Sequence, residues 1–371
     1  MTPTKTYRWA HSRSRKETPP KDGTPRATSW LLSAMSNSGE ISVGPITSLP
    51  AVLTSLGCKP RHAFAETGID PKVFENPENR LHLVEVGRLL ETCVKLTNCP
   101  HLGLLLGARF QMRDFGPLGH LLRNAPSVGD ALRSLAMNLH YHDRGAIPVL
   151  VAPTPSTTLL GYSVYNPRTP AIPIIYDVAV TIGFRILGEL CGPAWKPKSV
   201  QFSFRKPSNT ETYRRLFRAP IRFDSEVSGV VFSSRDLDRP IDGADAFLHR
   251  LLTTAMQDQA KAKMTLGEQV QEVLYQMVLS GNYSANAVCS LFGLHDRALR
   301  RRLALEGRQL HELVQQTRFE LAQLLLENTD RPVSDIAPTL GYRDANAFSR
   351  AFRTWSGLSP RNWRYEHALP D

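Results

Sequence analysis

Polar side chains suited to paired hydrogen bonds gather on two helical stretches near the C-terminal end of the chain, and most of them are arginine. Arginine and asparagine fit the edges of guanine and adenine, and a good pair contributes roughly 1 to 3 kcal/mol of discrimination between bases. The residues that we predict to contact DNA are Arg297, Arg300, Arg301, Arg343, Asn346, Ser349, Arg350 and Arg353. A charged face in solvent is the alternative for each of them, and Arg301 and Arg350 could also brace their own domain.

Two similar segments precede these side chains. The run VCSLFGL at residues 288–294 aligns with IAPTLGY at residues 336–342, at an offset of 48. In both runs an apolar residue and a small residue come before a glycine. The small residue lets two helices approach closely, and the glycine accepts the positive φ that ends the first helix. The repeat therefore predicts two helix-turn-helix units.

The helices that follow the two turns also correspond, at an offset of 49. Leu299 and Leu303 match Phe348 and Phe352, and each pair is spaced i, i+4. Residues at this spacing share one face of a helix, so both pairs should be buried against the first helix of their unit. The opposite faces, which carry the side chains above, are then left for DNA.

Between the units, the run LHELVQQTRFELAQLLL repeats apolar residues at spacings near three, four and seven. This pattern predicts a helix of about eighteen residues, which spans roughly 27 Å. That length is not far short of the ~34 Å between successive major grooves on one face of DNA. A single chain could therefore place both recognition helices in neighbouring grooves.

The stretch SDIAPTLGYRDANAFSRAFRTWSGLSPRNWR closely resembles the signature of AraC/XylS-type transcription regulators, and the resemblance extends over residues 265–365. It implies that the helices beginning near Asp296 and Asp344 are the recognition helices. It also implies that Arg318 and the GLSP turn hold the domain together. The sequence departs from the family pattern at His295, where a serine or threonine cap is usual, and at Pro338, which removes a backbone donor.

A looser resemblance covers residues 50–248, through the runs DFGPLGHLL, LCGPAWKPKSVQFSF and YRRLFRAPIRFDSE. These are similar to the arabinose-binding-like N-terminal domain of the family branch that includes ornithine-utilisation regulators. The resemblance implies a sensor that binds a small organic effector and helps to form a homodimer. It also favours an activator, for which RNA polymerase would be a further partner. The effector and the residues that bind it are unknown from the sequence.

The elements of this N-terminal stretch predict an α+β domain. Helical spacing dominates residues 49–106 and continues to about residue 140, and the runs IPVLVA and TLLGYSVY then predict a strand pair. A helix over residues 174–190 follows, and VQFSF and GVVFS predict strands on either side of a helix near Tyr213. The predicted fold is therefore an α+β sensor domain followed by an all-α domain with two helix-turn-helix units joined by a long helix.

The chain divides into five predicted parts. Few aliphatic residues precede Trp30, so the N-terminal end lacks the apolar surface that would offset the entropy of ordering, and translation could start at Met35 instead of Met1. The parts are a disordered basic tail (1–45), an α+β effector-sensing and dimerisation domain (46–246), a linker helix (247–264), the double helix-turn-helix DNA-binding domain (265–366) and a short tail (367–371).

Composition narrows the class of protein. Hydrophobic residues at 42% and charged residues at 21% are typical of globular chains. No run approaches the roughly 18 apolar residues of a membrane helix, and the N-terminus lacks the apolar core of a signal peptide. A net charge of +11 favours a polyanionic partner, although ribosome-associated and membrane-surface proteins share this feature. The five scattered cysteines fit reduced thiols, so we expect a cytoplasmic protein.

Two clusters have an alternative chemical interpretation. His140, His142 and Asp143 could converge on a metal ion, but without a further ligand at a suitable spacing a polar turn is the preferred interpretation. Cys93 and Cys99 could form a redox sensor, but their apolar surroundings favour core packing. We therefore predict neither a metal nor a cofactor.

Other candidate residues are interpreted as structural. Asp114 and Gly116 are typical of a capped turn. A ligand pocket is the alternative to core packing for four aromatic residues, Tyr162, Tyr165, Phe184 and Trp195.

An enzyme is not expected, because the sequence has no GxSxG, P-loop, GxGxxG or HExxH motif. The remaining alternative is a DNA-binding protein that needs no effector and whose N-terminal domain is structural or binds a partner.

Overall fold

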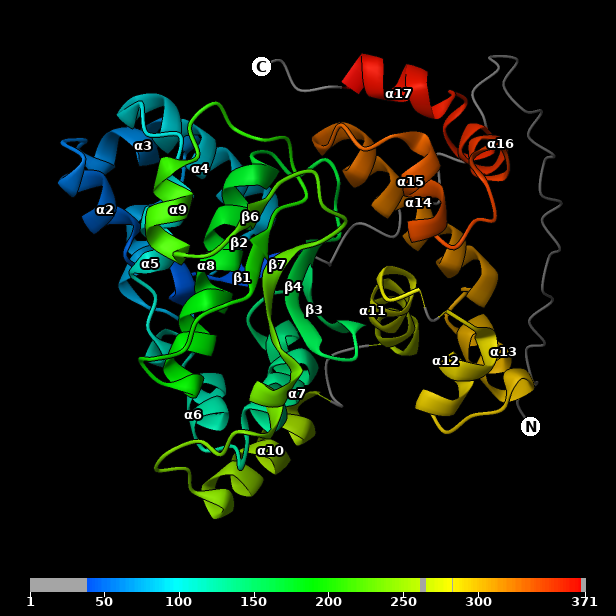
Figure 1. Cartoon of the computed structure of the whole chain (residues 1–371), viewed down its shortest axis with the longest axis horizontal. Helices are drawn as coiled ribbons and strands as arrows, with labels where there is room; N and C mark the ends of the chain where they lie inside the picture. Colours follow the sequence, from blue (N-terminus) through cyan, green and yellow to red (C-terminus); the bar gives the residue numbers. More distant parts are fainter. Residues whose placement is uncertain (1–38, 261–264, 282, 368–371) are drawn as a thin grey trace, which may run out of the picture. The chain divides into compact units, whose positions relative to one another are not determined.

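The computed structural model describes residues 39–260, 265–281 and 283–367 (Figure 1). Most of the predicted tail, Met35 included, and residues 368–371 lie outside this part of the chain. The predicted tail nevertheless extends too far, because β1 (Glu40–Ser42) pairs antiparallel with β2 (Arg80–His82). Val43, which follows β1, is fully buried, so this stretch is anchored in the core.

A five-stranded sheet in the order β3-β4-β7-β5-β6 forms the centre of the N-terminal half. Strands β3 (Ala146–Thr154) and β4 (Thr157–Val164) are the predicted antiparallel pair, and β7 (Ser228–Ser233) adds to β4, also antiparallel. With helices packed against this sheet, the predicted α+β class is confirmed.

The other edge of the sheet is shorter than predicted. Strand β5 (Ser199–Gln201) pairs with β7 and, in parallel, with the two-residue strand β6 (Ile221–Arg222). We predicted a strand as far as residue 204, but Phe202 and Phe204 leave the ladder, and their rings lie 5.1 Å apart in a buried aromatic cluster. Burial of these rings decides the end of the strand.

Helix α8 (Ile172–Cys191) is the predicted long helix, and it packs against β4, β7 and the short helix α5 (Leu102–Ala108). Two glycines of α5 make the close approach possible. A Cβ at Gly103 would lie 2.5 Å from the carbonyl oxygen of Ile174, and one at Gly107 would lie 2.7 Å from the Cβ of Thr181. The core of this half therefore depends on missing side chains as well as on large ones.

The N-terminal half contains further helices and 3-10 turns. They are η1 (Gly44–Ile46), α2 (Leu49–Ser55), α3 (Pro60–Thr67), η2 (Pro71–Glu75), α4 (Leu83–Thr97), η3 (Met112–Phe115), α6 (Pro117–Arg123), α7 (Val128–Asn138), η4 (Leu139–Tyr141), α9 (Glu211–Phe217), η5 (Ser234–Asp238) and α10 (Ala246–Ala260). No helix of the described residues is long and apolar enough to cross a membrane.

The turn at Asp114 and Gly116 is structural, as predicted. The Asp114 carboxylate accepts a hydrogen bond from the Gln111 backbone N–H at 2.7 Å, and Gly116 has a φ of 51°. Cys93 and Cys99 are both buried, which confirms the interpretation as core residues, and burial raises the pKa of the Cys93 thiol to about 12.

The predicted linker segment is helical as far as Ala260, but α10 does not run free. It packs against α6, and the Asn124 side chain accepts a hydrogen bond from the Asp245 N–H at 3.1 Å. The His249 ring lies 3.0 Å from the Leu121 carbonyl oxygen. Residues 261–264, the end of the predicted linker, lie outside the described residues.

The C-terminal half is entirely helical, with the two helix-turn-helix units joined by a long helix as predicted (Figure 1, yellow to red). The joining helix α14 has 19 residues. The helices are α11 (Leu266–Leu279), α12 (Ala285–Leu291), α13 (Asp296–Leu305), α14 (Leu310–Asn328), α15 (Val333–Thr339), α16 (Ala345–Ser356) and α17 (Pro360–His367).

Both turns have the predicted chemistry. Leu299 and Leu303 of α13, like Phe348 and Phe352 of α16, are fully buried. The two turn glycines, at residues 293 and 341, have φ values of 60° and 76°, a region where glycine is favoured. Pro338 lies in the last turn of α15, where the helix ends one residue later, so the loss of its N–H does not change the register of the second unit.

Arg318 on α14 contacts an aromatic ring beside each of the two units. Its guanidinium carbon lies 5.5 Å from the centre of the Tyr283 ring, before the first unit, and 5.2 Å from that of Tyr342, in the turn of the second. Cations at such distances are attracted to the faces of aromatic rings. These contacts are the geometry that the bracing role implied by the family resemblance requires.

The core of the second unit is aromatic. The Phe319 ring of α14 lies 5.5 Å from Phe352, 5.7 Å from Trp355 and 6.1 Å from Trp363 of α17. The GLSP turn sets the direction of α17, with Gly357 in the left-handed region and Pro360 buried at the start of the helix. In the first unit, the residue that corresponds to Phe352 is Leu303.

Substitution of Gly103 tests the packing of α5 on α8. We expect Gly103→Ala to lower the free energy of unfolding by about 1 to 3 kcal/mol, because the added methyl group overpacks the contact with Ile174. Gly188→Ala is the matched control: Gly188 lies in α8 with nothing within 4 Å of its Cβ position, so alanine should raise stability by up to about 1 kcal/mol. Denaturant unfolding followed by circular dichroism measures both, and equal destabilisation would contradict this packing.

Substitution of Arg318 tests the brace. Arg318→Met keeps an unbranched apolar side chain but removes the charge between the two tyrosines, and we expect it to lower the free energy of unfolding by about 1 to 3 kcal/mol. Arg302→Met, on the exposed surface of α13, is the control and should change it by less than about 0.5 kcal/mol. The prediction is wrong if thermal unfolding of the two variants is the same.

Candidate nucleic-acid interface

The first predicted face is exposed on α13. Arg297, Arg300 and Arg301 point away from the buried pair Leu299 and Leu303, as the helical spacing predicts. All three guanidinium groups are therefore available to a partner that approaches from solvent.

One of these three arginines is already paired. The Arg300 Nε lies 2.9 and 2.8 Å from the two carboxylate oxygens of Asp296, one turn earlier. This hydrogen bond and the negative charge raise the pKa of the Arg300 guanidinium. The pair holds Arg300 along the helix and offsets its charge, which we did not predict, although the i, i+4 spacing of aspartate and arginine is a sequence signal for it.

The second predicted face is exposed on α16. Asp344 caps this helix, because its carboxylate accepts a hydrogen bond from the Ala347 N–H at 2.7 Å, and this bond lowers the pKa of Asp344. His295 stands at the corresponding position before α13 and makes no side-chain cap. Asn346, Arg350 and Arg353 are exposed on the side of α16 away from its buried phenylalanines.

The two other predicted residues of the second unit make local bonds. The Arg343 Nε lies 3.1 Å from a carboxylate oxygen of Asp344, and the Ser349 hydroxyl donates to the Ala345 carbonyl at 2.7 Å. Ser349 is only partly exposed. Both side chains would have to exchange these bonds to contact another molecule.

The exposed faces of α13 and α16 correspond position by position. At the offset of 49, Arg297 matches Asn346, and Arg301 matches Arg350. In the part of the chain that the structure describes, Arg297, Arg301, Arg350 and Arg353 form no ion pair. The structure thus presents unpaired arginines on both faces, on two helices that share the brace at Arg318.

The last turn of α14 and the segment that follows it contact loops of the N-terminal half. The Arg205 guanidinium donates to the Glu327 carbonyl at 2.7 Å and pairs with Asp330 at 2.7 Å. Arg331 pairs with Glu226 at 2.8 Å. These residues are more than a hundred positions apart in the sequence, so no local pattern could have predicted the contacts.

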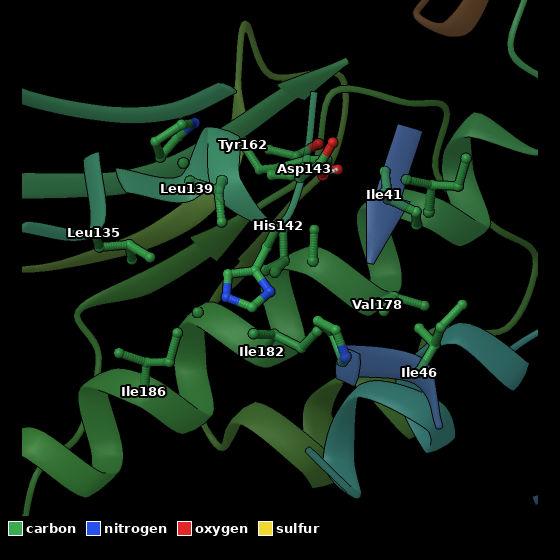
Figure 2. Close-up of a pocket in the computed structure, with 18 of the residues that line it drawn as sticks. Ile41, Ile46, Leu135, Leu139, His142, Asp143, Tyr162, Val178, Ile182 and Ile186 are labelled. Carbon is green, nitrogen blue, oxygen red and sulfur yellow. Dashed lines mark hydrogen bonds between the residues drawn. The ribbon is translucent and has the colours of Figure 1, made fainter. Parts of the chain in front are cut away.

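A cavity of about 110 Å³ lies in the N-terminal half, among α8, the sheet and the residues around β1 (Figure 2). Aliphatic side chains such as Val178, Ile182 and Ile186 form most of its wall. The polar side chains in the wall include His142, Asp143 and Tyr162. A small, mostly apolar molecule is the kind of ligand that such a wall suits.

The cluster at residues 140–143 lies in and just after η4, at the turn that leads into β3. Among the described residues there is no group of three or more His, Cys, Asp or Glu that could hold a metal ion. The Asp143 carboxylate instead accepts hydrogen bonds from the Gly145 N–H at 2.8 Å and from the Tyr162 hydroxyl. Burial raises the pKa of Asp143 to about 6.

The four aromatic candidates separate into two groups. Tyr162 packs against the core, with its ring 6.4 Å from that of Tyr176, and it also lines the cavity. The other three pack against neighbouring rings: Tyr165 lies 4.7 Å from Tyr275, and Phe184 lies 6.0 Å from Trp195.

Models of known protein families match both halves of the chain. Residues 57–241 match the family model described as the arabinose-binding domain of AraC transcription regulators, and residues 288–366 match a helix-turn-helix domain. The two matched ranges lie on the two halves described above.

Two characterised relatives match this chain over most of their own length. The chain is 29% identical over 320 residues to the HTH-type transcriptional regulator VirS of Mycobacterium tuberculosis, covering 84% of this chain and 93% of VirS. It is 24% identical over 331 residues to the ornithine utilization regulator of Pseudomonas aeruginosa, with coverage of 84% and 93%. The transcriptional activator NphR of a Rhodococcus species is 30% identical over 144 residues, 39% of this chain and 42% of NphR.

These relatives are transcription regulators, and the two matched domains are found in the order that the fold shows. The chain belongs to the AraC/XylS family of DNA-binding transcription regulators, in the branch with an arabinose-binding-type N-terminal domain.

Proposed function

We propose that this regulator binds a specific operator through both α13 and α16 and responds to a small organic effector through its N-terminal half. The observation that carries the proposal is the pair of corresponding exposed faces, with Arg297 and Arg301 on one helix and Asn346 and Arg350 on the other. Such side chains distinguish bases in the major groove. The length of α14, 19 residues or about 28 Å, suits two neighbouring grooves.

The predicted contact residues form two groups, according to whether the side chain already makes a local hydrogen bond. Arg297, Arg301, Asn346, Arg350 and Arg353 are assigned to base edges or phosphates directly. Arg300, Arg343 and Ser349 are assigned weaker contacts, because each must first give up a local hydrogen bond.

A response to an effector needs a physical link between the two halves. The contacts of Arg205 and Arg331 with the segment that leads into α15 support such a link. A ligand shifts an equilibrium only if it binds one state better than another, and the coupling must be reciprocal. Effector and operator should therefore each change the affinity of the chain for the other.

The remaining assignments follow the relatives. Activation is proposed because NphR is named a transcriptional activator, and an activator would also contact RNA polymerase. Division into a sensing and dimerising part that includes β1, a linker helix and a DNA-binding part is proposed, with the linker (247–264) and DNA-binding (265–366) boundaries given above, and a homodimer is proposed with it.

Footprinting on the DNA upstream of its own gene, at fixed near-physiological salt, tests the paired reader. We expect protection of two adjacent major-groove segments. Arg350→Ala should weaken binding at least about five-fold and reduce protection of one segment, whereas Arg297→Ala should reduce protection of the other. Arg302→Ala, an exposed arginine of α13 outside the predicted face, is the control and should leave the pattern unchanged. Diffuse coating that depends on salt and is insensitive to Arg350→Ala would contradict the proposal.

A further inference from the structure

The wall of the cavity in the N-terminal half selects an apolar ligand body. Its volume of about 110 Å³ is several times that of a water molecule, and engineered apolar cavities of about 150 Å³ bind benzene. Leu135 and Leu139 on one side and Ile182 and Ile186 of α8 on the other surround the space (Figure 2). A compact ring or branched chain would contact these side chains in place of solvent.

One polar side chain in this wall has an unused hydrogen-bonding atom. His142 is 6% exposed, and its Nδ1 is buried without a partner in the described part of the chain. Figure 2 shows its ring in the middle of the cavity, near Ile182. A buried polar atom without a partner is unfavourable, so a ligand that satisfies Nδ1 would gain from doing so.

The protonation of His142 determines which partner it needs. Burial and the nearby charge of Arg80 lower the pKa of the ring to about 4, so it is neutral at pH 7. A neutral imidazole carries one N–H, which we assign to Nε2 as part of this inference, because Nδ1 is the ring nitrogen that is buried without a partner. Nδ1 is then an acceptor, and it requires a ligand that brings a hydrogen-bond donor.

The other polar groups of the wall are already paired. The Asp143 carboxylate accepts from the Gly145 N–H and from the Tyr162 hydroxyl. The proton of Tyr162 is used in the same contact. Neither residue is therefore free to pair with an ammonium or a carboxylate of a ligand. A charged ligand would bury an unpaired charge in this cavity, which is unfavourable.

We propose that this cavity binds an uncharged molecule with a compact apolar body and a single hydroxyl group, which donates a hydrogen bond to Nδ1 of His142. Phenol is the simplest molecule of this class. The inference rests on the proposed response to an effector, and it names the chemical class of that effector.

Calorimetric titration of the full chain with phenol and toluene tests the assignment. The two probes have nearly the same size, and only phenol can donate a hydrogen bond. We expect phenol to bind about five- to ten-fold more tightly than toluene, and His142→Leu should abolish this difference. His140→Leu is the matched control, because His140 also has a pKa lowered to about 4 by burial but does not line the cavity.

A second variant locates the binding site without removing His142. Gly183 lines the cavity, and a Cβ there would lie an ordinary 3.7 Å from Leu160, so Gly183→Leu should fold and fill the space. We expect it to lose the binding of both probes. Equal affinity for phenol and toluene, tighter binding of benzoate or benzylamine, or phenol binding that survives Gly183→Leu would each overturn the proposal.

The affinity of the chain for operator DNA, measured with and without phenol, separates this inference from the proposed function. Phenol that binds through His142 without changing DNA affinity would support the cavity assignment and contradict the effector response. A DNA affinity that changes with a charged probe and not with phenol would support the effector response and overturn the hydroxyl ligand.

Discussion

The burial of α14 on nearly every side is the constraint on which the two DNA-binding units depend. This helix packs against α11 and α17, and two of its buried polar side chains bond within it: the Thr317 hydroxyl donates to the Leu313 carbonyl at 2.9 Å, and Gln316 donates to Glu320 at 2.9 Å. A helix held on several sides cannot bend without losing contacts on one of them. The separation of α13 and α16 is therefore a property of one rigid element.

The two units solve the same packing problem with different side chains. Leu299 and Leu303 close the first unit, whereas Phe348 and Phe352 close the second within a larger group of rings. The exposed faces differ as well, because Arg300 is paired with Asp296 while its counterpart is Ser349. Internal repetition thus preserves the geometry of the reader while the two helices present different chemistry to DNA.

Local patterns in the sequence predicted the elements whose stability depends on residues nearby. The pairs spaced i, i+4 in α13 and α16, the turn glycines and the apolar runs of strands β3 and β4 all have short-range causes. The end of β5 was predicted wrongly because Phe202 and Phe204 are drawn into a cluster with Phe223, which is distant in the sequence. The predicted tail was too long for the same reason, since β1 needs β2 as its partner.

The candidate sites also combine features that local sequence patterns predict with features that depend on residues far apart in the sequence. The exposed arginines could be named from helical spacing, but the pairing of Arg343 with Asp344 depends on how the helix starts. The cavity joins β1, α4, α8 and the sheet, so no single stretch of sequence carries its signature. Tyr162 appeared to be an ordinary core aromatic because only its contact with Asp143 and the space beside it distinguish it.

The aromatic core of the second unit also makes the two units optically distinct. The chain has five tryptophans, and two of them, Trp355 and Trp363, lie around Phe319 and Phe352, whereas residues 265–309, which include the first unit, contain none. Indole emission from the DNA-binding half therefore originates in the second unit alone. Changes in that emission report motion or unfolding of α16 and α17. The same events in α13 do not change it directly, because the first unit has no tryptophan.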